Sequence, residues 1–191
     1  MQKALTFLLV KAVLGTFFLS PHSAAHPPGQ DSTASSENQT IKVRMLMLST
    51  LGNIETGTIT IEETPYGILF KPVLNSITPG FHGFHLHEHG SCDPVVRDGK
   101  TILAGAAGGH YDPHNTGKHG FPWDQNSHLG DLPALFADAV GTVTDPVLAP
   151  RLSLADLRGR ALIIHVGGDN HSDHPAPLGG GGARLACGVI N

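Results

Sequence analysis

Aromatic and basic residues are scarce in this 191-residue chain. Aromatic side chains make up 6% of the residues, and 12 Lys and Arg stand against 16 Asp and Glu, which gives a formal net charge of −4 at pH 7. A nucleic-acid-binding protein would show a basic excess, so this balance excludes a generic binder of that class. No stretch beyond the first 25 residues approaches the length of a membrane span. The 40% of hydrophobic residues still suffices for a globular core.

Long helical patterns are also missing. No amphipathic run after residue 25 reaches about 12 residues without Gly or Pro, so helices have little support. The chain instead has 24 Gly, 14 Pro and 13 His, which is typical of a loop-rich β protein with metal chemistry. A helical turn is expected only at residues 152–157. Short apolar or alternating segments predict strands at residues 41–49, 54–63, 66–73, 81–87, 139–143, 161–166 and 184–190.

The first 25 residues have the pattern of a secretory signal peptide. A positive start at Lys3 precedes an apolar stretch, and small residues at 23–25 predict cleavage after Ala25. Cleavage would remove Lys3 and Lys11 and no acid, so the net charge would become −6. Residues 26–40 are polar and predict a flexible tail, which leaves residues 41–191 as the folded domain.

The two cysteines, Cys92 and Cys187, form an even pair in a chain predicted to be exported. Such a pair indicates a disulfide, and the alternative is two buried free thiols. The closed loop of about 95 residues would stabilise the fold by roughly 4–5 kcal/mol in the chain-entropy model.

A segment of about 30 residues, 104–133, resists assignment to strands or helices and needs something to order it. His110, His119 and His128 recur nine residues apart within it, and Asp131 follows three residues later. Three imidazoles and a carboxylate suit tetrahedral zinc. The alternative is that these histidines are exposed polar groups.

A second histidine cluster lies at residues 80–92. His85 and His87 are two residues apart and would project from the same face of a strand, where they could bind copper or zinc. His89 shares this parity and His82 does not, so spacing alone leaves open which pair binds. Taken alone, a His-x-His pair is more often a solvated strand face.

The third cluster is C-terminal. His165 ends an apolar strand, where a hydrogen-bonded core histidine is the simpler interpretation. Asp169, four glycines at 179–182 and Arg184, three residues before Cys187, follow it.

Taken together, these clusters resemble the copper,zinc superoxide dismutase family in its exported bacterial form. The matching segments are GFHGFHLHEHGSC, AGGHYDPHNTGKHG, HLGDLPAL and GRALIIHVGGDNHSDHPAPLGGGGARLACGVI. They spread from residue 80 to residue 190, and the strand-rich stretch from residue 41 fits the opening strands of the family. A match in several blocks is far more specific than one His-x-His pair.

The resemblance implies an all-β fold, a flattened eight-stranded antiparallel Greek-key β-barrel (an immunoglobulin-like sandwich) with long metal-binding and electrostatic loops. It implies one copper and one zinc per chain, with His110 bridging the two as an imidazolate and Asp169 linking a copper histidine to a zinc histidine. It also implies that His82 hydrogen-bonds to the backbone and that Cys92 and Cys187 form the family disulfide. The implied copper ligands are His85, His87, His110 and His165, and the implied zinc ligands are His110, His119, His128 and Asp131. The family gives no ligand role to His89, His114, His171 or His174, which are expected at the surface.

The implied reaction converts superoxide to dioxygen and hydrogen peroxide by alternate reduction and oxidation of the histidine-bound copper. His110 would release copper on reduction and take up a proton. Arg184 would be the active-site cation that attracts the anionic substrate. The resemblance also implies a periplasmic location, and the aromatics at 121–123 favour a homodimer. The alternatives are an exported metal storage or delivery module and, more distantly, a structural protein that keeps only its zinc loop.

Overall fold

The computed structural model describes residues 40–191. The predicted signal peptide, residues 1–25, and residues 26–39 of the predicted tail lie outside this range. Thr40, the last residue of that tail, is the first residue of a strand. None of the described residues lies in a helix long and apolar enough to cross a membrane.

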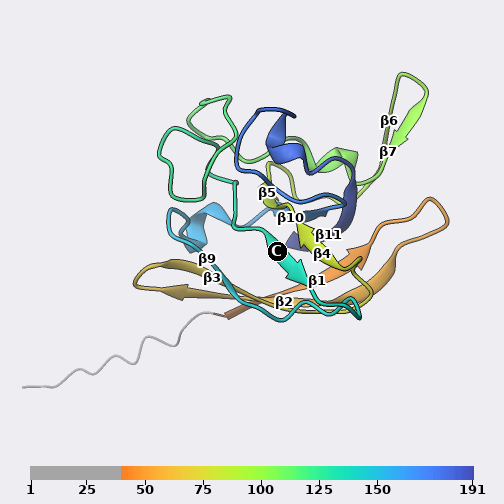
Figure 1. The fold of residues 1–191 in the computed structure, drawn as a ribbon, viewed down its shortest axis with the longest axis horizontal. Helices are drawn as coiled ribbons and strands as arrows, with labels where there is room; N and C mark the ends of the chain where they lie inside the picture. The colour runs from red at the N-terminus through yellow and green to blue at the C-terminus, as the bar shows by residue number, and fades with distance from the viewer. Residues whose placement is uncertain (1–39) are drawn as a thin grey trace, which may run out of the picture. The chain divides into compact units, whose positions relative to one another are not determined.

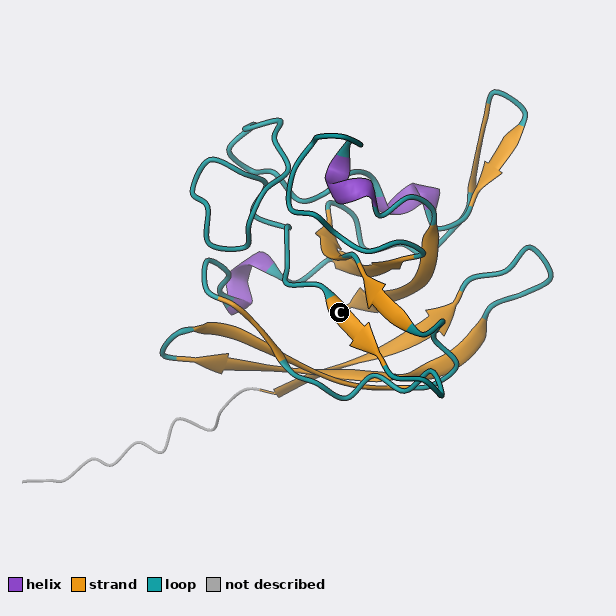
Figure 2. Cartoon of the chain, in the orientation of Figure 1, coloured by secondary structure: helices purple, strands orange, loops and turns teal. Residues whose placement is uncertain are grey.

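The described residues form strands and three short 3-10 helices, with loops between them (Figure 2). The strands are β1 (Thr40–Met47), β2 (Ile54–Thr64), β3 (Gly67–Leu74), β4 (Gly80–His82), β5 (Phe84–His87), β6 (Val95–Arg97), β7 (Lys100–Ile102), β8 (Leu135–Ala137), β9 (Val147–Ala149), β10 (Arg160–His165) and β11 (Arg184–Ile190), and the helices are η1 (Gly105–Ala107), η2 (Leu154–Asp156) and η3 (Leu178–Gly180).

Seven strands make one curled antiparallel sheet, in the order β5-β10-β11-β1-β2-β3-β9 (Figure 1). β4 and β8 form a separate two-stranded ribbon, and β6 and β7 form a hairpin that projects from the body. Strands far apart in sequence are neighbours, as β1 is to β11 and β5 to β10, which is the connectivity of a Greek key. The predicted all-β Greek-key barrel is confirmed.

The core follows the two-residue period of the strands. In β3, Ile68, Phe70, Pro72 and Leu74 are buried and alternate with more exposed residues. The Phe70 ring meets Phe84 of β5 edge-to-face, with ring centroids 5.4 Å apart. β5 and β10 are buried almost throughout, so the strands that carry histidines lie inside the molecule.

Two strand predictions need correction. Residues 139–143 form a turn, because the Asp138 carboxylate accepts hydrogen bonds from the N–H groups of Val140 and Thr142, and such local bonds compete with a ladder. The strands lie on either side of that turn, as β8 and β9. The predicted strand at 81–87 is two strands, β4 and β5, which pair with β8 and β10 respectively.

The break between β4 and β5 is at Gly83. Its N–H donates to the Gly167 carbonyl at 2.8 Å, and its carbonyl accepts the His165 N–H at 2.8 Å. The helical turn predicted at 152–157 is present as η2, with a capping box made by Ser153 and Asp156.

Candidate metal centre

Two neighbouring strands supply three of the predicted copper ligands. His85 and His87 project from β5, which pairs with β10 through Ile163↔His85 and Ala161↔His87. His165 ends β10 and pairs across to Arg184 at the start of β11. The three histidines are at most 7% exposed. The antiparallel register therefore brings the His-x-His pair and the strand-end histidine to one place.

The long segment 104–133 runs beside β5 and adds the fourth histidine. Isolated bridges join His87 to His110 and His85 to Asp131. Gly130 lies at the junction, where its carbonyl accepts the Leu86 N–H at 2.9 Å. A Cβ at Gly130 would lie 2.2 Å from the Leu86 carbonyl oxygen, so a residue with a side chain would push the loop away from β5.

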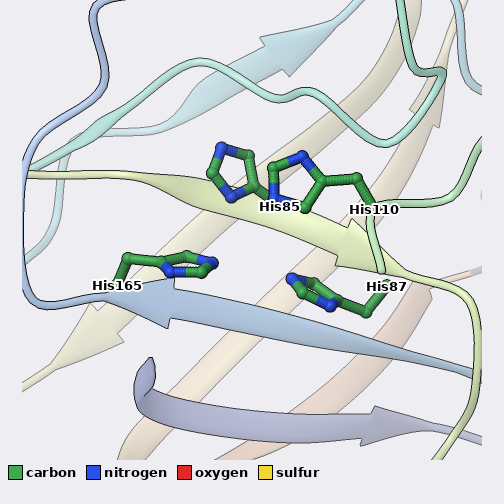
Figure 3. A group of neighbouring side chains, drawn as sticks. All are labelled: His85, His87, His110 and His165. Atoms are coloured by element: carbon green, nitrogen blue, oxygen red, sulfur yellow. The ribbon is translucent and has the colours of Figure 1, made fainter. Parts of the chain in front are cut away.

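The rings of these four histidines point toward one another (Figure 3). One ligand nitrogen from each lies within 4.8 Å of the others. In each ring one nitrogen is hydrogen-bonded, to Asp169, Gly108, Asp131 or Gly182. The other nitrogen is buried without a hydrogen-bond partner; these atoms are His85 Nδ1, His87 Nε2, His110 Nε2 and His165 Nε2.

Four buried nitrogens without partners are costly unless something binds them. A transition-metal ion with imidazole ligands would satisfy all four, and imidazole suits copper. The hydrogen bond on the opposite nitrogen of each ring is the arrangement that orients metal-binding histidines. The cluster therefore fits a copper ion.

A second set of side chains converges on Asp131. Its Oδ1 lies 2.9 Å from Nδ1 of His110, 2.9 Å from Nδ1 of His119 and 3.2 Å from Nδ1 of His128. Its Oδ2 accepts the Gly120 N–H at 2.9 Å. Three imidazoles around one carboxylate match the donors of a closed tetrahedral zinc site. His110 faces both clusters, with Nδ1 toward Asp131 and Nε2 toward the other histidines.

Asp169 links the two clusters. Its Oδ2 is 2.8 Å from His85 Nε2, and its Oδ1 is 2.8 Å from His119 Nε2. Oδ1 also accepts the His171 N–H at 2.7 Å, which holds the carboxylate in place. Asp169 therefore contacts one ring in each of the two sets of histidines.

Burial and hydrogen bonding set the protonation of the site. Burial is the main cause that lowers the pKa of His165 to about 4 and those of His85 and His87 well below the ordinary value. Burial also acts to lower the pKa of His119, but hydrogen bonds to Asp131 and Asp169 outweigh it and raise that pKa to about 9.

Burial acts to raise the pKa values of the Asp131 and Asp169 carboxyls. The histidine hydrogen bonds outweigh it and hold both pKa values well below the ordinary range. The four-histidine cluster is therefore neutral at pH 7, which metal binding requires, and the carboxylates are charged.

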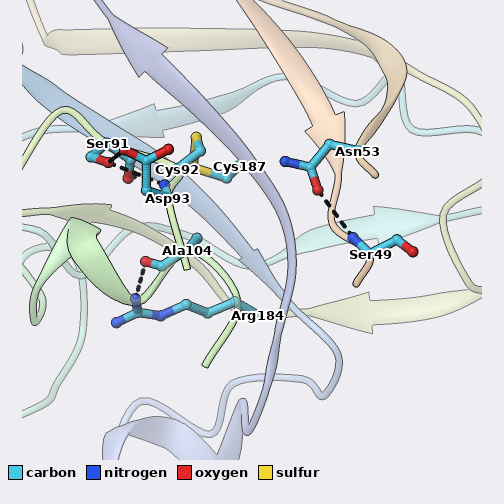
Figure 4. The surroundings of a disulfide bond; sticks show 8 residues. All are labelled: Ser49, Asn53, Ser91, Cys92, Asp93, Ala104, Arg184 and Cys187. Carbon is cyan, nitrogen blue, oxygen red and sulfur yellow. Dashed lines mark hydrogen bonds between the residues drawn. A yellow bond between two sulfur atoms is a disulfide. The ribbon is translucent and has the colours of Figure 1, made fainter. Parts of the chain in front are cut away.

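Arg184 lies beside the four-histidine cluster. Its guanidinium donates hydrogen bonds to the Ala104 and Gly108 carbonyls, the first of which is drawn in Figure 4. The Gly108 carbonyl also lies 3.0 Å from His87 Nδ1, so one peptide group contacts both the arginine and a histidine. A cleft of about 390 Å³ is lined by Glu88, Arg97 and Arg184 among others.

The predicted disulfide is confirmed. Cys92 and Cys187 are bonded, with Cα atoms 5.8 Å apart and a separation of 95 positions in sequence. Cys187 is buried in β11, three residues after Arg184, so the bond ties the strand that carries the arginine to the loop after β5 (Figure 4).

Other histidines among residues 40–191 lie outside the two clusters. His89, His114 and His174 are exposed, as expected. His82 is buried and both its ring nitrogens face backbone carbonyls, those of His165 at 2.7 Å and Thr78 at 2.6 Å.

His171 is only partly exposed. Its side chain is 18% exposed, its ring stacks on His119 with ring centroids 6.4 Å apart, and its N–H donates to Asp169. Sequence reasoning also missed Arg151, which donates hydrogen bonds to the loop that carries His128. Nothing in its sequence neighbourhood indicated that contact.

The fold and the site define a β-barrel protein with two adjoining clusters of candidate metal ligands, and His110 faces both of them. Residues 55–190 match the family model described as copper/zinc superoxide dismutase. A superoxide dismutase [Cu-Zn] of Photobacterium leiognathi is 58% identical over 152 residues, covering 80% of this chain and 87% of the relative. The chain belongs to the copper/zinc superoxide dismutase family.

Solved structures of copper/zinc superoxide dismutases are also similar to this chain. The Cu/Zn superoxide dismutase from Brucella abortus is 52% identical, with a TM-score of 0.78. The match covers 80% of this chain and 100% of the Brucella abortus chain. The solution structure of the monomeric copper, zinc superoxide dismutase from Salmonella enterica is 53% identical, with a TM-score of 0.72 and the same coverage. The predicted activity, a superoxide dismutase with copper and zinc as cofactors, is confirmed.

Proposed function

We propose that His85, His87, His110 and His165 bind the copper ion and that His110, His119, His128 and Asp131 bind the zinc ion. The copper assignment rests on the set of four converging, buried ring nitrogens without hydrogen-bond partners. The zinc assignment rests on the three imidazoles around the Asp131 carboxylate. Copper supplies one-electron redox chemistry when bound, and zinc, which has none, orders the loop.

The chain's own groups have distinct roles in the conversion of superoxide to dioxygen and hydrogen peroxide. His110 Nε2 takes up and delivers a proton, while Nδ1 stays on the Asp131 side. Arg184 attracts the anionic substrate, and the carbonyls of Ala104 and Gly108 hold its guanidinium in place. Asp169 orients His85 and His119.

Metal content and dismutation measured together test the assignment. The purified protein should show fast turnover when it holds one copper and one zinc per chain. His87→Ala should lose copper and activity. His89→Ala is the matched control, because His89 has the same parity in sequence but is exposed, and it should retain both. Full copper loading without turnover would favour metal storage or delivery instead.

The protein is proposed to act in the periplasm after removal of residues 1–25. The positive start, the apolar stretch and the small residues at 23–25 support this. Fractionation of a Gram-negative host, with N-terminal sequencing of the periplasmic form, tests it. Retention of Met1 in the cytoplasm would contradict it.

A homodimer is proposed through the loop at 121–123. Phe121 and Trp123 are 44% and 64% exposed, and their rings stack with centroids 5.0 Å apart, while Phe121 also contacts the His171 ring at 5.1 Å. Exposed aromatic pairs are typical of contact surfaces. Light scattering should give a dimer that Trp123→Ser weakens and Tyr66→Ser, at an exposed position outside this loop, does not. A monomer at all concentrations, the state described for the Salmonella enterica relative, would contradict the proposal.

A further inference from the structure

The side chain of Arg151 donates hydrogen bonds to residues 122–128 of the long segment 104–133. Its Nε donates to the Pro122 carbonyl at 2.8 Å, and Nη1 donates to the Ser127 carbonyl at 3.2 Å. Nη2 donates to Ser127 Oγ at 3.2 Å and to the His128 carbonyl. All three nitrogens of the planar guanidinium are therefore used on the segment that ends at His128, a geometry that a lysine amine cannot reproduce.

These contacts reach the zinc ligands through the backbone. The His128 carbonyl accepts from Arg151, and the His128 N–H donates to the Lys118 carbonyl at 2.9 Å. Lys118 immediately precedes His119, and the Asp131 N–H also donates to the His128 carbonyl, at 3.3 Å. Movement of the backbone at His128 would therefore disturb the backbone next to His119 and Asp131.

Two opposing electrostatic effects act on the guanidinium of Arg151. Burial lowers the pKa of the guanidinium, and the negative charges of Asp131 and Asp124 oppose that effect. A cation close to the position of a divalent ion is unfavourable for binding by charge alone. The benefit of Arg151 to the site must therefore come from the geometry of its hydrogen bonds.

We propose that Arg151 is a positioning residue of the zinc site, which sets the place of His128 and so the affinity and coordination geometry of the bound ion. The inference rests on the proposed zinc ligands. A role limited to general stability of the loop is the alternative that the experiment must separate.

Zinc retention against a competing chelator tests the proposal in the copper- and zinc-loaded protein. Arg151→Lys keeps the charge but loses the planar guanidinium with its three donor nitrogens. It should weaken zinc binding about 10- to 100-fold, as changes around metal ligands commonly do. Arg158→Lys is the matched control, because Arg158 is exposed and makes one hydrogen bond, to the Asn191 carbonyl at 3.1 Å. Cobalt(II) placed at the zinc position should show an altered visible spectrum in Arg151→Lys only.

The outcomes distinguish a failure of the proposed zinc ligands from a failure of the proposed role of Arg151. If the wild-type protein holds no zinc, the ligand assignment fails. If it holds one zinc per chain and Arg151→Lys keeps it as tightly, with an unchanged cobalt spectrum, only the Arg151 proposal is overturned, even if the metal-free variant melts at a lower temperature. Should Arg151→Lys not fold, Arg151→Gln removes the guanidinium that donates to the Pro122, Ser127 and His128 carbonyls, and normal zinc retention in that folded variant would overturn the proposal.

Discussion

The carboxylate of Asp169 accepts hydrogen bonds from one ring in each histidine cluster. An asparagine at this position has one oxygen and an NH₂ group, which cannot accept the second ring N–H. Asp169→Asn should therefore weaken both metals, by about 10- to 100-fold. Metal content after dialysis against a chelator measures this. Asp138→Asn is the control, since Asp138 holds only the turn before β9. Loss of one metal alone would contradict a linking role.

Arg184 offers a test of charge rather than coordination. Arg184→Ala should lower the dismutation rate about tenfold or more and weaken its fall with added salt, because attraction of an anion is screened by ions. Arg184→Lys keeps the charge and should keep the salt dependence. Both metals should remain bound in each variant. A variant that loses copper would show that the arginine supports the ligands instead.

Single residues differ in how far the sequence could predict them. His85, His87 and His165 came from the family motif, since strand parity alone admitted His89. In the structure the chain bends at residues 88–90, directly after β5, which exposes His89. The contacts of Arg151 and His171 were unpredictable, because they depend on how separate loops lie against each other.

At the scale of elements, the glycine segment at 179–182 forms part of the wall of the site. A Cβ at Gly179 would lie 2.0 Å from Asp169 Oδ1 and 2.7 Å from His119 Nε2. Gly179→Ala should therefore displace the carboxylate and lower retention of both metals. Gly182→Ala is a close control, because Gly182 has nearly the same φ, +70° against +71°, and nothing lies within 4 Å of its Cβ. Equal losses in both variants would mean that backbone strain alone is responsible.

The strand predictions were correct where apolar alternation was long and wrong where local hydrogen bonds decide. β1, β2, β3, β10 and β11 follow their patterns closely. The segment 139–143 looked like a strand from its apolar residues, but the carboxylate of Asp138 closes a turn there. The division between β4 and β5 depends on a contact between Gly83 and Gly167, which sequence periodicity does not contain.

For the whole molecule, the neutral buried histidines predict a pH dependence of stability. In the unfolded chain a histidine has a pKa of about 6.5. Burial lowers the pKa of His165 to about 4, and those of His85 and His87 are also well below 6.5. Between pH 6.5 and 4 the unfolded metal-free chain binds protons that the folded one excludes, so the free energy of unfolding decreases as the pH falls. His165 alone accounts for about 3 kcal/mol.

The contribution of His119 to the free energy of unfolding has the opposite pH dependence and changes over a different pH range. Its pKa is raised to about 9, so its contribution is complete below pH 6.5 and is lost as the pH rises toward 9. Between pH 7 and pH 5 the loss of stability from His85, His87 and His165 dominates, so the metal-free protein should unfold at a lower urea concentration at pH 5 than at pH 7. An equal or higher midpoint at pH 5 would contradict the protonation states assigned to the cluster.

The position of His110, with one nitrogen facing each cluster, has a thermodynamic consequence. Under the ligand assignment proposed above, the copper and zinc ions share His110 and cannot bind independently, so the assignment implies a coupling free energy between the two sites. Coupling of this kind is reciprocal: the factor by which zinc changes the affinity for copper equals the factor by which copper changes the affinity for zinc. The order in which the protein acquires its two metals therefore alters the affinity at each step but not the total free energy of loading.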